Sequence, residues 1–118
     1  MLNLDTHILI HALFNTLSKT ELQKISGNKL AISDIVIWEM AKLTQIGRID
    51  LNWDLELKES FSEIKVIPID FEIARATLHL DFSSDPADEL IAATSIVKNI
   101  PLLTRDKRIR KSKIVPLA

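Results

Sequence analysis

Short apolar runs alternate along the chain with stretches of helical periodicity. Five runs have the length and composition of β-strands, at residues 2–5, 29–33, 65–69, 101–104 and 113–116. Between them, apolar residues recur three or four positions apart, which is typical of amphipathic helices. Strands separated by helices indicate a parallel sheet covered on both faces, because parallel strands need a long crossover connection. The pattern therefore predicts an α/β protein of three layers with an open, five-stranded parallel sheet.

Capping residues mark the ends of several predicted helices. Ser18 and Glu21 have the spacing of a capping box, and Gly27 is expected to end that helix in the left-handed conformation. Gly47 is expected to end the helix after the second strand in the same way. Asp85 is the expected N-cap of a later helix, because a proline follows it at the first helical position. Further helices are expected at residues 54–64, 71–80 and 106–111.

The amino-acid composition excludes several classes of protein. The 118 residues contain no Cys, which excludes disulfides, thiolate zinc sites and a cysteine nucleophile. Only two Gly are present, too few for the glycine-rich loops that bind phosphates and dinucleotides. No apolar run has the length of a membrane span, and the N-terminus lacks the pattern of a signal peptide. We expect one cytoplasmic domain over residues 1–118, with no membrane contact.

Charge is distributed unevenly along the chain. The net charge is −1, yet residues 105–113 hold six of the 15 Lys and Arg and only one of the 16 Asp and Glu. A basic segment on an otherwise acidic chain is one signature of a nucleic-acid contact. A solvated helix face has the same composition, and the segment taken alone favours this second interpretation.

Acidic residues stand where the predicted strands end. In an open parallel sheet the ligand crevice lies beyond the carboxyl ends of the strands. Asp5 ends the first strand, Asp106 closely follows the fourth, and Asp88 begins the helix that precedes the fourth strand. Glu39 lies beside the apolar stripe of the helix after the second strand, so its side chain is expected to point inward. These carboxylates are therefore expected to converge on one crevice.

Such a convergence needs a compensating charge. Two carboxylates about 5 Å apart repel each other by roughly 3 kcal/mol at an effective dielectric constant near 20. Four carboxylates form six such pairs, whereas a domain is stable by only about 5–15 kcal/mol. Protonation or a divalent cation relieves the repulsion, and oxygen ligands without cysteine suit Mg2+ or Mn2+. A metal held in this way assists the hydrolysis of a phosphodiester.

Each acid also has a purely structural interpretation. Asp5 and Asp106 stand where they can cap helices, and Asp85 and Asp88 fall in the first turn of a helix, where carboxylates are stabilising. For Asp85 the capping interpretation is preferred. Taken singly, the acids favour structural roles; taken together at the ends of different strands, they favour a site.

Five segments have the order and spacing found in the PIN-domain ribonucleases. They are LDTH at 4–7, IWEMAKL at 37–43, GRI at 47–49, DPADELIAAT at 85–94 and LTRD at 103–106. The sequence most closely resembles the VapC-type toxins of prokaryotic toxin–antitoxin pairs, and the resemblance covers essentially the whole chain. Glu89 departs from the pattern, because relatives often have a basic residue there, and Ala87 replaces a bulkier residue.

The resemblance implies a fold, an activity and partners. It implies the strand order 3-2-1-4-5, which places the first and fourth strands side by side. It implies a metal-dependent endoribonuclease that cleaves RNA, is inhibited by a cognate antitoxin protein and forms a homodimer. The acidic quartet of the family matches Asp5, Glu39, Asp88 and Asp106, and the accompanying hydroxyls match Thr6 and Thr104.

A mechanism follows from this assignment as a hypothesis. Asp5, Asp88 and Asp106 would hold one or two Mg2+ ions, with Mn2+ as a substitute, while Glu39 orients or deprotonates the attacking water. RNA is a polyanion, so the rim of an acidic pocket needs cations. The candidates for this contact are Arg105, Lys107, Arg108 and Arg110.

Other interpretations of the sequence remain open. A receiver-like phosphoacceptor would need an acidic pair after the first strand and a phosphorylated aspartate after the third, where Asp70 resembles a helix cap instead. A protein-binding domain without catalysis would not need all four acids. His7 and His11 are one helical turn apart and form a weak candidate for a zinc pair, for which helix packing is the preferred interpretation.

Overall fold

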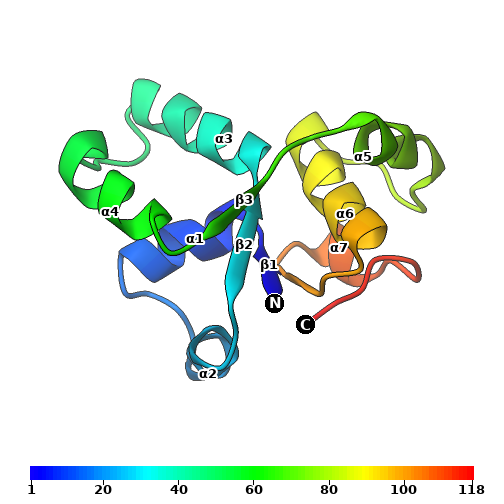
Figure 1. Ribbon diagram of the computed structural model, residues 1–118, viewed down its shortest axis with the longest axis horizontal. Helices are drawn as coiled ribbons and strands as arrows, with labels where there is room; N and C mark the ends of the chain where they lie inside the picture. The colour runs from blue at the N-terminus through cyan, green and yellow to red at the C-terminus, as the bar shows by residue number, and fades with distance from the viewer.

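The computed structural model describes residues 1–118 and is built on a parallel sheet of four strands (Figure 1). The strands are β1 (Leu2–Leu4), β2 (Leu30–Ser33), β3 (Lys65–Ile67) and β4 (Leu102–Leu103), in the order β3-β2-β1-β4. The helices are α1 (Thr6–Leu13), α2 (Lys19–Ser26), α3 (Asp34–Gln45), the π-helix η1 (Trp53–Leu57), α4 (Lys58–Phe61), α5 (Phe71–Ala76), the 3-10 helix η2 (Thr77–His79), α6 (Pro86–Lys98) and α7 (Lys107–Arg110). Figure 1 shows α1, α3 and α4 on one side of the sheet and α5, α6 and α7 on the other. The α/β fold with a parallel sheet is therefore confirmed.

The predicted fifth strand at 113–116 is not formed, and only an isolated bridge follows it at Leu117. Leu117 pairs with Leu102 in parallel beside β4, and the Leu102 amide donates to the Pro116 carbonyl over 2.9 Å. Pro116 has no N–H to donate to a ladder. The amides of Ile114 and Val115 donate instead to the Ser112 hydroxyl. The segment lies where the order 3-2-1-4-5 places it, but it does not form a regular strand.

Of the helix caps predicted at Ser18, Gly27, Gly47 and Asp85, only the one at Gly27 is wrong. The capping box of α2 is formed, and Gly47 has φ 78° after α3. Gly27 has φ −92°, so the left-handed ending expected there is wrong. The Asn28 side chain donates to the Lys24 carbonyl over 2.8 Å, which satisfies the end of α2 without a left-handed turn. The longest helix, α6, ends at Asn99, which takes the left-handed conformation with φ 53°.

Two predicted helices are divided in the structure. The segment 54–64 forms the π-helix η1 and then α4, and the segment 71–80 forms α5 and then η2. Asn52 caps η1 by accepting from the amides of Asp54 and Leu55. Asp70 caps α5 by accepting from the Ile73 amide over 2.9 Å. These segments cover the sheet and carry none of the predicted site acids.

The core lies on both faces of the sheet. Neighbouring residues of a strand face opposite sides. Accordingly Ile32 belongs to the larger buried cluster, with Leu4 and Met40, whereas Ala31 belongs to a smaller one with Ile73. A buried polar contact also crosses the layers, because Asn3 of β1 donates to the Ser95 hydroxyl of α6 over 2.9 Å. No helix combines the length and the apolar character needed to cross a membrane.

Candidate active site at the carboxyl ends of the strands

The four predicted acids lie at the carboxyl-end edge of the sheet. Asp5 directly follows β1 and is the N-cap of α1, and Asp106 follows β4 and is the N-cap of α7. Since β1 and β4 are adjacent and in parallel register, these two acids leave the sheet from neighbouring strands. Glu39 projects from α3 and Asp88 from the first turn of α6. The four side chains are called the acidic quartet below.

Asp5 is the most enclosed member of the quartet, with 3% of its surface exposed. The Thr104 hydroxyl donates to its Oδ2 over 2.5 Å, and the Thr6 amide donates to its Oδ1 over 2.8 Å. Burial raises the pKa of the Asp5 carboxyl, and the nearby Asp106 carboxylate adds to the rise. The hydrogen bonds and the His7 ring oppose that rise. The capping role expected for Asp5 is therefore combined with a desolvated charge.

Thr104 connects two members of the quartet. Its hydroxyl donates to Asp5 and accepts a hydrogen bond from the Asp106 amide over 3.0 Å. The Asp106 carboxylate caps α7 through Oδ1, which accepts from the amides of Arg108 and Ile109. Its Oδ2 takes part in neither bond. The hydroxyl thus fixes the path of the chain between β4 and α7 relative to Asp5.

Glu39 is half-buried and is held by the other predicted hydroxyl. The Thr6 hydroxyl donates to Glu39 Oε1 over 2.5 Å. Burial raises the pKa of the Glu39 carboxyl, and the carboxylates of Asp88 and Asp5 raise it further. The prediction that Glu39 points inward is confirmed by these neighbours.

Asp88 is held by a residue that the sequence analysis did not single out. The Ser84 hydroxyl donates to Asp88 Oδ2 over 2.9 Å, and the Ser84 amide donates to Glu89. Burial raises the pKa of the Asp88 carboxyl, with further contributions from Asp5 and Asp106. A serine four residues before an acid of the quartet was the only available signal. Asp85 is the N-cap of α6, as expected, but its side chain makes no capping hydrogen bond.

The members of the quartet act on one another's charge. Each pKa that is raised is raised partly by other members, and together these influences include all four carboxylates. The side chains therefore face one region. In the conformation described, no group of three or more His, Asp or Glu side chains is close enough to hold a metal ion. The site therefore provides partly desolvated, mutually repelling carboxylates, which favour a cation or a proton.

An open hollow of about 300 Å³ adjoins the quartet. It is lined by Asp5, His7, His11, Arg105 and Asp106. His11 Nδ1 lies 2.6 Å from the Thr16 hydroxyl and its Nε2 lies 3.0 Å from Arg105 Nη1. Both ring nitrogens are thus engaged within the protein, which leaves no free nitrogen for a zinc ion shared with His7.

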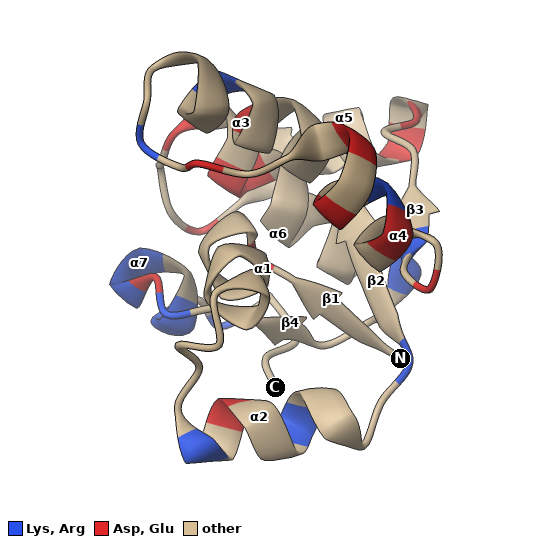
Figure 2. Ribbon diagram, turned by 90° about the vertical axis from the view of Figure 1, so that its left-hand side faces the viewer, with Lys and Arg blue, Asp and Glu red and all other residues tan.

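The four basic residues proposed to meet RNA differ in their contacts. Figure 2 shows α7 as a concentration of basic residues. Arg105 forms an ion pair with Glu21, with Nη2 2.6 Å from Oε1. Arg108 donates to the Ser83 carbonyl and Arg110 to the Thr104 carbonyl, each over 3.3 Å. Lys107 forms no ion pair.

Asp70, the acid on which the receiver-like interpretation depends, is occupied structurally. Besides capping α5, its carboxylate forms an ion pair with Lys98 over 3.5 Å. The amide of Ile73 is the main reason that the pKa of Asp70 is lowered. The helix-cap interpretation of this residue is therefore confirmed.

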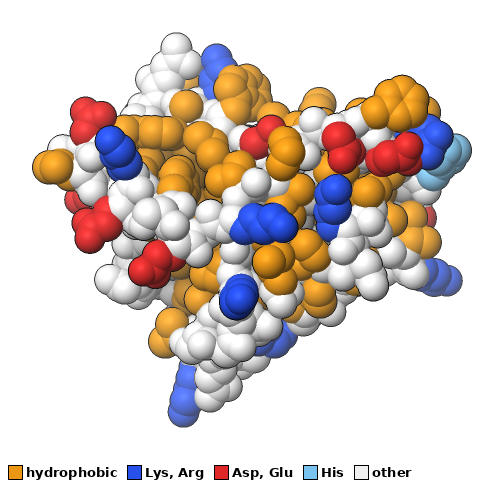
Figure 3. Space-filling model, in the orientation of Figure 1, with side chains coloured by type: hydrophobic (Ala, Val, Ile, Leu, Met, Phe, Trp, Pro, Cys, Tyr) orange, Lys and Arg blue, Asp and Glu red, His pale blue; other side chains and the backbone are white.

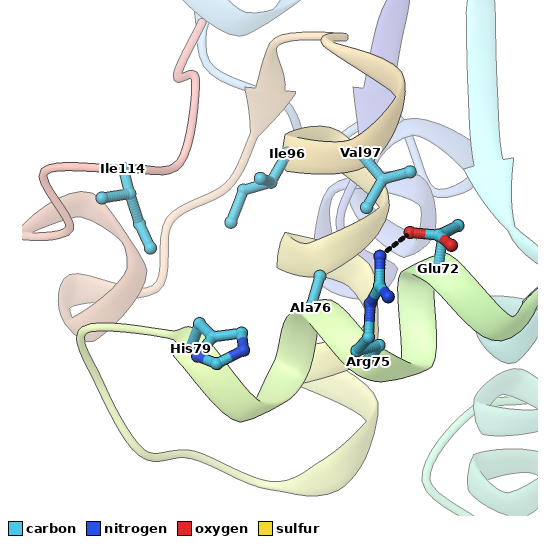
Figure 4. A pocket seen from close by; sticks show the side chains of 7 residues that line it. All are labelled: Glu72, Arg75, Ala76, His79, Ile96, Val97 and Ile114. Atoms are coloured by element: carbon cyan, nitrogen blue, oxygen red, sulfur yellow. Dashed lines mark hydrogen bonds and ion pairs between the residues drawn. The ribbon is translucent and has the colours of Figure 1, made fainter.

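A second hollow of similar size, about 290 Å³, lies among α5, η2, α6 and the C-terminal segment (Figure 4). Apolar side chains such as Ile96, Val97 and Ile114 form much of its lining. Its acid, Glu72, is already paired with Arg75, as the dashed line in Figure 4 shows. None of the predicted site residues lines this hollow.

Comparison with known proteins identifies relatives of the whole fold. The model of the PIN domain matches residues 3–114. Ribonuclease VapC22 from Mycobacterium tuberculosis is 34% identical over 92 residues, covering 74% of this chain and 70% of the relative. The VapBC2 structure from Rickettsia felis, bound to a DNA fragment of its promoter, matches with a TM-score of 0.80 at 20% identity, covering 100% of this chain and 98% of the other. DNA-bound VapBC from Salmonella typhimurium matches with a TM-score of 0.76 at 19% identity, covering 99% and 96%.

Proposed function

Because this chain belongs to the PIN-domain family and to the VapC ribonucleases within it, we propose that it is an endoribonuclease toxin that depends on Mg2+ and is neutralised by a cognate antitoxin. The substrate is RNA and the bond cleaved is a phosphodiester. The relative named above is a ribonuclease, and the similar structures are complexes of toxin with antitoxin.

The observation that carries the proposal is the electrostatics of the acidic quartet. Burial and mutual repulsion raise the pKa of three of its carboxyls, which means that their charges are inadequately compensated within the protein. A hard divalent cation with oxygen ligands supplies that compensation, and Mg2+ or Mn2+ fits the donor set.

Each member of the quartet has a separate role in this proposal. Asp5, Asp88 and Asp106 hold the cation, directly or through water. Glu39, whose pKa is raised by burial and by the neighbouring carboxylates, orients the attacking water and accepts its proton. When bound, the metal neutralises phosphoryl charge and lowers the pKa of water. Thr6 and Thr104 hold the carboxylates of Glu39 and Asp5 in place.

Basic residues beside the quartet are proposed to bind the RNA backbone. Lys107, Arg108 and Arg110 of α7 are proposed to contact phosphates, since an acidic pocket alone repels a polyanion. Lys107 is the most available of them, because the two arginines also donate to backbone carbonyls. The chain contains no Tyr, so recognition is expected to rely on backbone and shape more than on base stacking.

The chain exposes apolar side chains that the proposed partners could cover. Trp38, Phe71 and Leu78 are 54%, 74% and 77% exposed. Figure 3 shows apolar side chains interspersed with charged ones across the face viewed. We propose that such surface serves the antitoxin and a second copy of the chain, as a homodimer. We also propose that residues 1–118 form one domain and that the protein acts in the cytoplasm.

The experiment is an RNA cleavage assay on the purified chain with Mg2+, Mn2+ or EDTA. The wild type is expected to cleave with either metal and to be inactive in EDTA, and Asp5→Asn is expected to be inactive throughout. Asp50→Asn makes the same chemical change at an exposed acid outside the quartet and is expected to match the wild type. Cleavage that persists in Asp5→Asn, or in EDTA, would refute the proposal. A stable acyl phosphate formed with a phosphoryl donor would support the receiver-like alternative instead.

A further inference from the structure

We infer that Glu21 is a positioning residue of the site: it clamps Arg105, and thereby holds the turn between β4 and α7 while keeping this arginine away from the acidic quartet. The inference deepens the proposed function and rests on it. Arg105 lies between Thr104 and Asp106 in the chain, so the position of its backbone determines where both of these site residues stand.

Glu21 and Arg105 form a bidentate ion pair. Arg105 Nε donates to Oε2 over 2.7 Å and Nη2 donates to Oε1 over 2.6 Å. The Glu21 side chain is 13% exposed, so the pair is largely shielded on its acidic side. Arg105 lowers the pKa of Glu21 to about 2, chiefly through these hydrogen bonds. Paired donors of this kind fix orientation as well as distance.

Glu21 is itself fixed by the first turn of α2. The Ser18 amide donates to its Oε1 over 2.8 Å, and its own amide donates to the Ser18 hydroxyl over 3.2 Å. The same carboxylate therefore completes the capping box and receives the arginine. The turn at Arg105 is tied in this way to the start of a helix 84 positions away in the sequence.

A third contact of the same guanidinium reaches α1. Arg105 Nη1 lies 3.0 Å from His11 Nε2, and Nη2 donates to the Thr16 carbonyl over 3.5 Å. A guanidinium only donates, so Nε2 accepts and the His11 proton lies on Nδ1, which donates to the Thr16 hydroxyl. Arg105 thus joins α1, the loop after it and α2.

This arrangement holds one of the two basic residues that flank Asp106 away from the quartet. Arg105 is adjacent to Asp106 and lines the same hollow as Asp5, yet its ion pair is with Glu21. Without Glu21, the guanidinium would be free to pair with the site carboxylates and to compete with a metal for them. This role differs from the direct contact with RNA that the sequence suggested for Arg105, and the two roles predict opposite effects of removing Glu21.

Glu21→Gln is the discriminating variant. Glutamine also completes a capping box at this position, so the start of α2 is preserved while the charge is lost. Glu72→Gln is the matched control, because it removes the acid of the exposed pair with Arg75 far from the quartet. Arg105→Ala and the double variant complete the set. Each is measured for metal binding by calorimetry without RNA, for cleavage kinetics, and for binding of RNA in EDTA.

The clamp predicts a distinct pattern across these variants. Glu21→Gln is expected to weaken metal binding about fivefold, the size of one ion pair near the surface, and to lower kcat about tenfold through misplacement of Asp106. The double variant is expected to recover metal affinity, because the competing guanidinium is gone, but to keep the low kcat. Glu72→Gln is expected to match the wild type.

Two outcomes would overturn the inference. One is a Glu21→Gln protein with wild-type metal affinity and kcat. The other is a Glu21→Gln protein that binds RNA in EDTA more tightly with kcat unchanged, which would make Arg105 an RNA contact that Glu21 merely restrains. Because metal binding is read without RNA, failure of the clamp is distinguishable from failure of the wild type to cleave RNA.

Discussion

Two hollows of nearly equal volume lie in different parts of this molecule and differ in what surrounds their acids. The hollow at the quartet, about 300 Å³, is bordered by Asp5, which is almost fully buried and has a raised pKa. The hollow between α5 and α6, about 290 Å³, is bordered by Glu72, which is exposed and paired with Arg75. Volume does not separate the two; uncompensated buried charge does. Reactivity is therefore expected where like charges are desolvated together.

The largest expected effect is on catalysis at the first hollow only. Asp88→Asn is expected to lower the rate of RNA cleavage about a thousandfold, because the charge that holds the cation is worth several kcal/mol in the transition state. Glu72→Gln in the second hollow is expected to change the rate less than twofold. Rates measured at saturating Mg2+ with circular dichroism as a check of folding test the contrast. Comparable losses in both variants would remove the distinction between the hollows.

The next effect is stabilisation by metal. At a Mg2+ concentration about 100 times its Kd, binding to the folded state adds about 2.7 kcal/mol to the free energy of unfolding, which raises the melting temperature by several degrees. Asp5→Asn is expected to lose this rise, whereas Glu72→Gln is expected to keep it. Thermal melts with Mg2+ and with EDTA provide the measurement, and an equal rise in all three proteins would place the cation elsewhere.

A smaller effect is expected from the hydroxyl that joins Asp5 to Asp106. Thr104→Val keeps the shape but leaves the buried Asp5 oxygen without its donor, at an expected cost of about 1–3 kcal/mol of stability. Thr104→Ser retains the hydroxyl and is expected to lose less than half as much. Chemical denaturation of the three proteins at pH 7 measures the costs, and a stable valine variant would show that the bond is dispensable.

The smallest effect is the pH dependence of stability. Carboxyls whose pKa is raised in the folded state bind more protons there than in the unfolded state, so their contribution is fully present below the ordinary pKa near 4 and is lost as the pH rises. Glu21 behaves oppositely, since its pKa falls from 4.5 to about 2 and its contribution is lost as the pH falls through that window.

Denaturation of the wild type and of Asp5→Asn at several pH values, in EDTA, measures the first of these contributions. From pH 4 to pH 7 the wild type is expected to lose stability relative to the variant. A difference that stays constant over this range would contradict the raised pKa of Asp5. Glu21→Gln, compared in the same way between pH 2 and pH 5, is expected to show the opposite sign.

Sequence reasoning worked best where position along the chain determines position in space. The alternation of strands and helices predicts the parallel sheet, in which Asp5 and Asp106 leave the same edge. That their strands are neighbours is implied by the family resemblance and is confirmed. Glu39 was predicted to point inward because a carboxylate beside an apolar stripe needs a partner, which proves to be Thr6.

It failed where distant or competing hydrogen bonds decide the outcome. The fifth strand does not form, because the amides of Ile114 and Val115 donate to the Ser112 hydroxyl and Pro116 has no N–H to donate. Gly27 does not take the left-handed conformation, because the Asn28 side chain donates to the Lys24 carbonyl at the end of α2. Arg105 is bound by Glu21, whose place beside it no local pattern reveals.

A crystal soaked in Mn2+ tests most directly whether Asp5, Asp88 and Asp106 hold a divalent cation. The anomalous scattering of Mn2+ locates the ion directly. An anomalous peak is expected within about 2.6 Å of carboxylate oxygens from at least two of Asp5, Asp88 and Asp106. A crystal of cleavage-competent protein with Mn2+ bound only elsewhere, or with no Mn2+ bound at all, would contradict it.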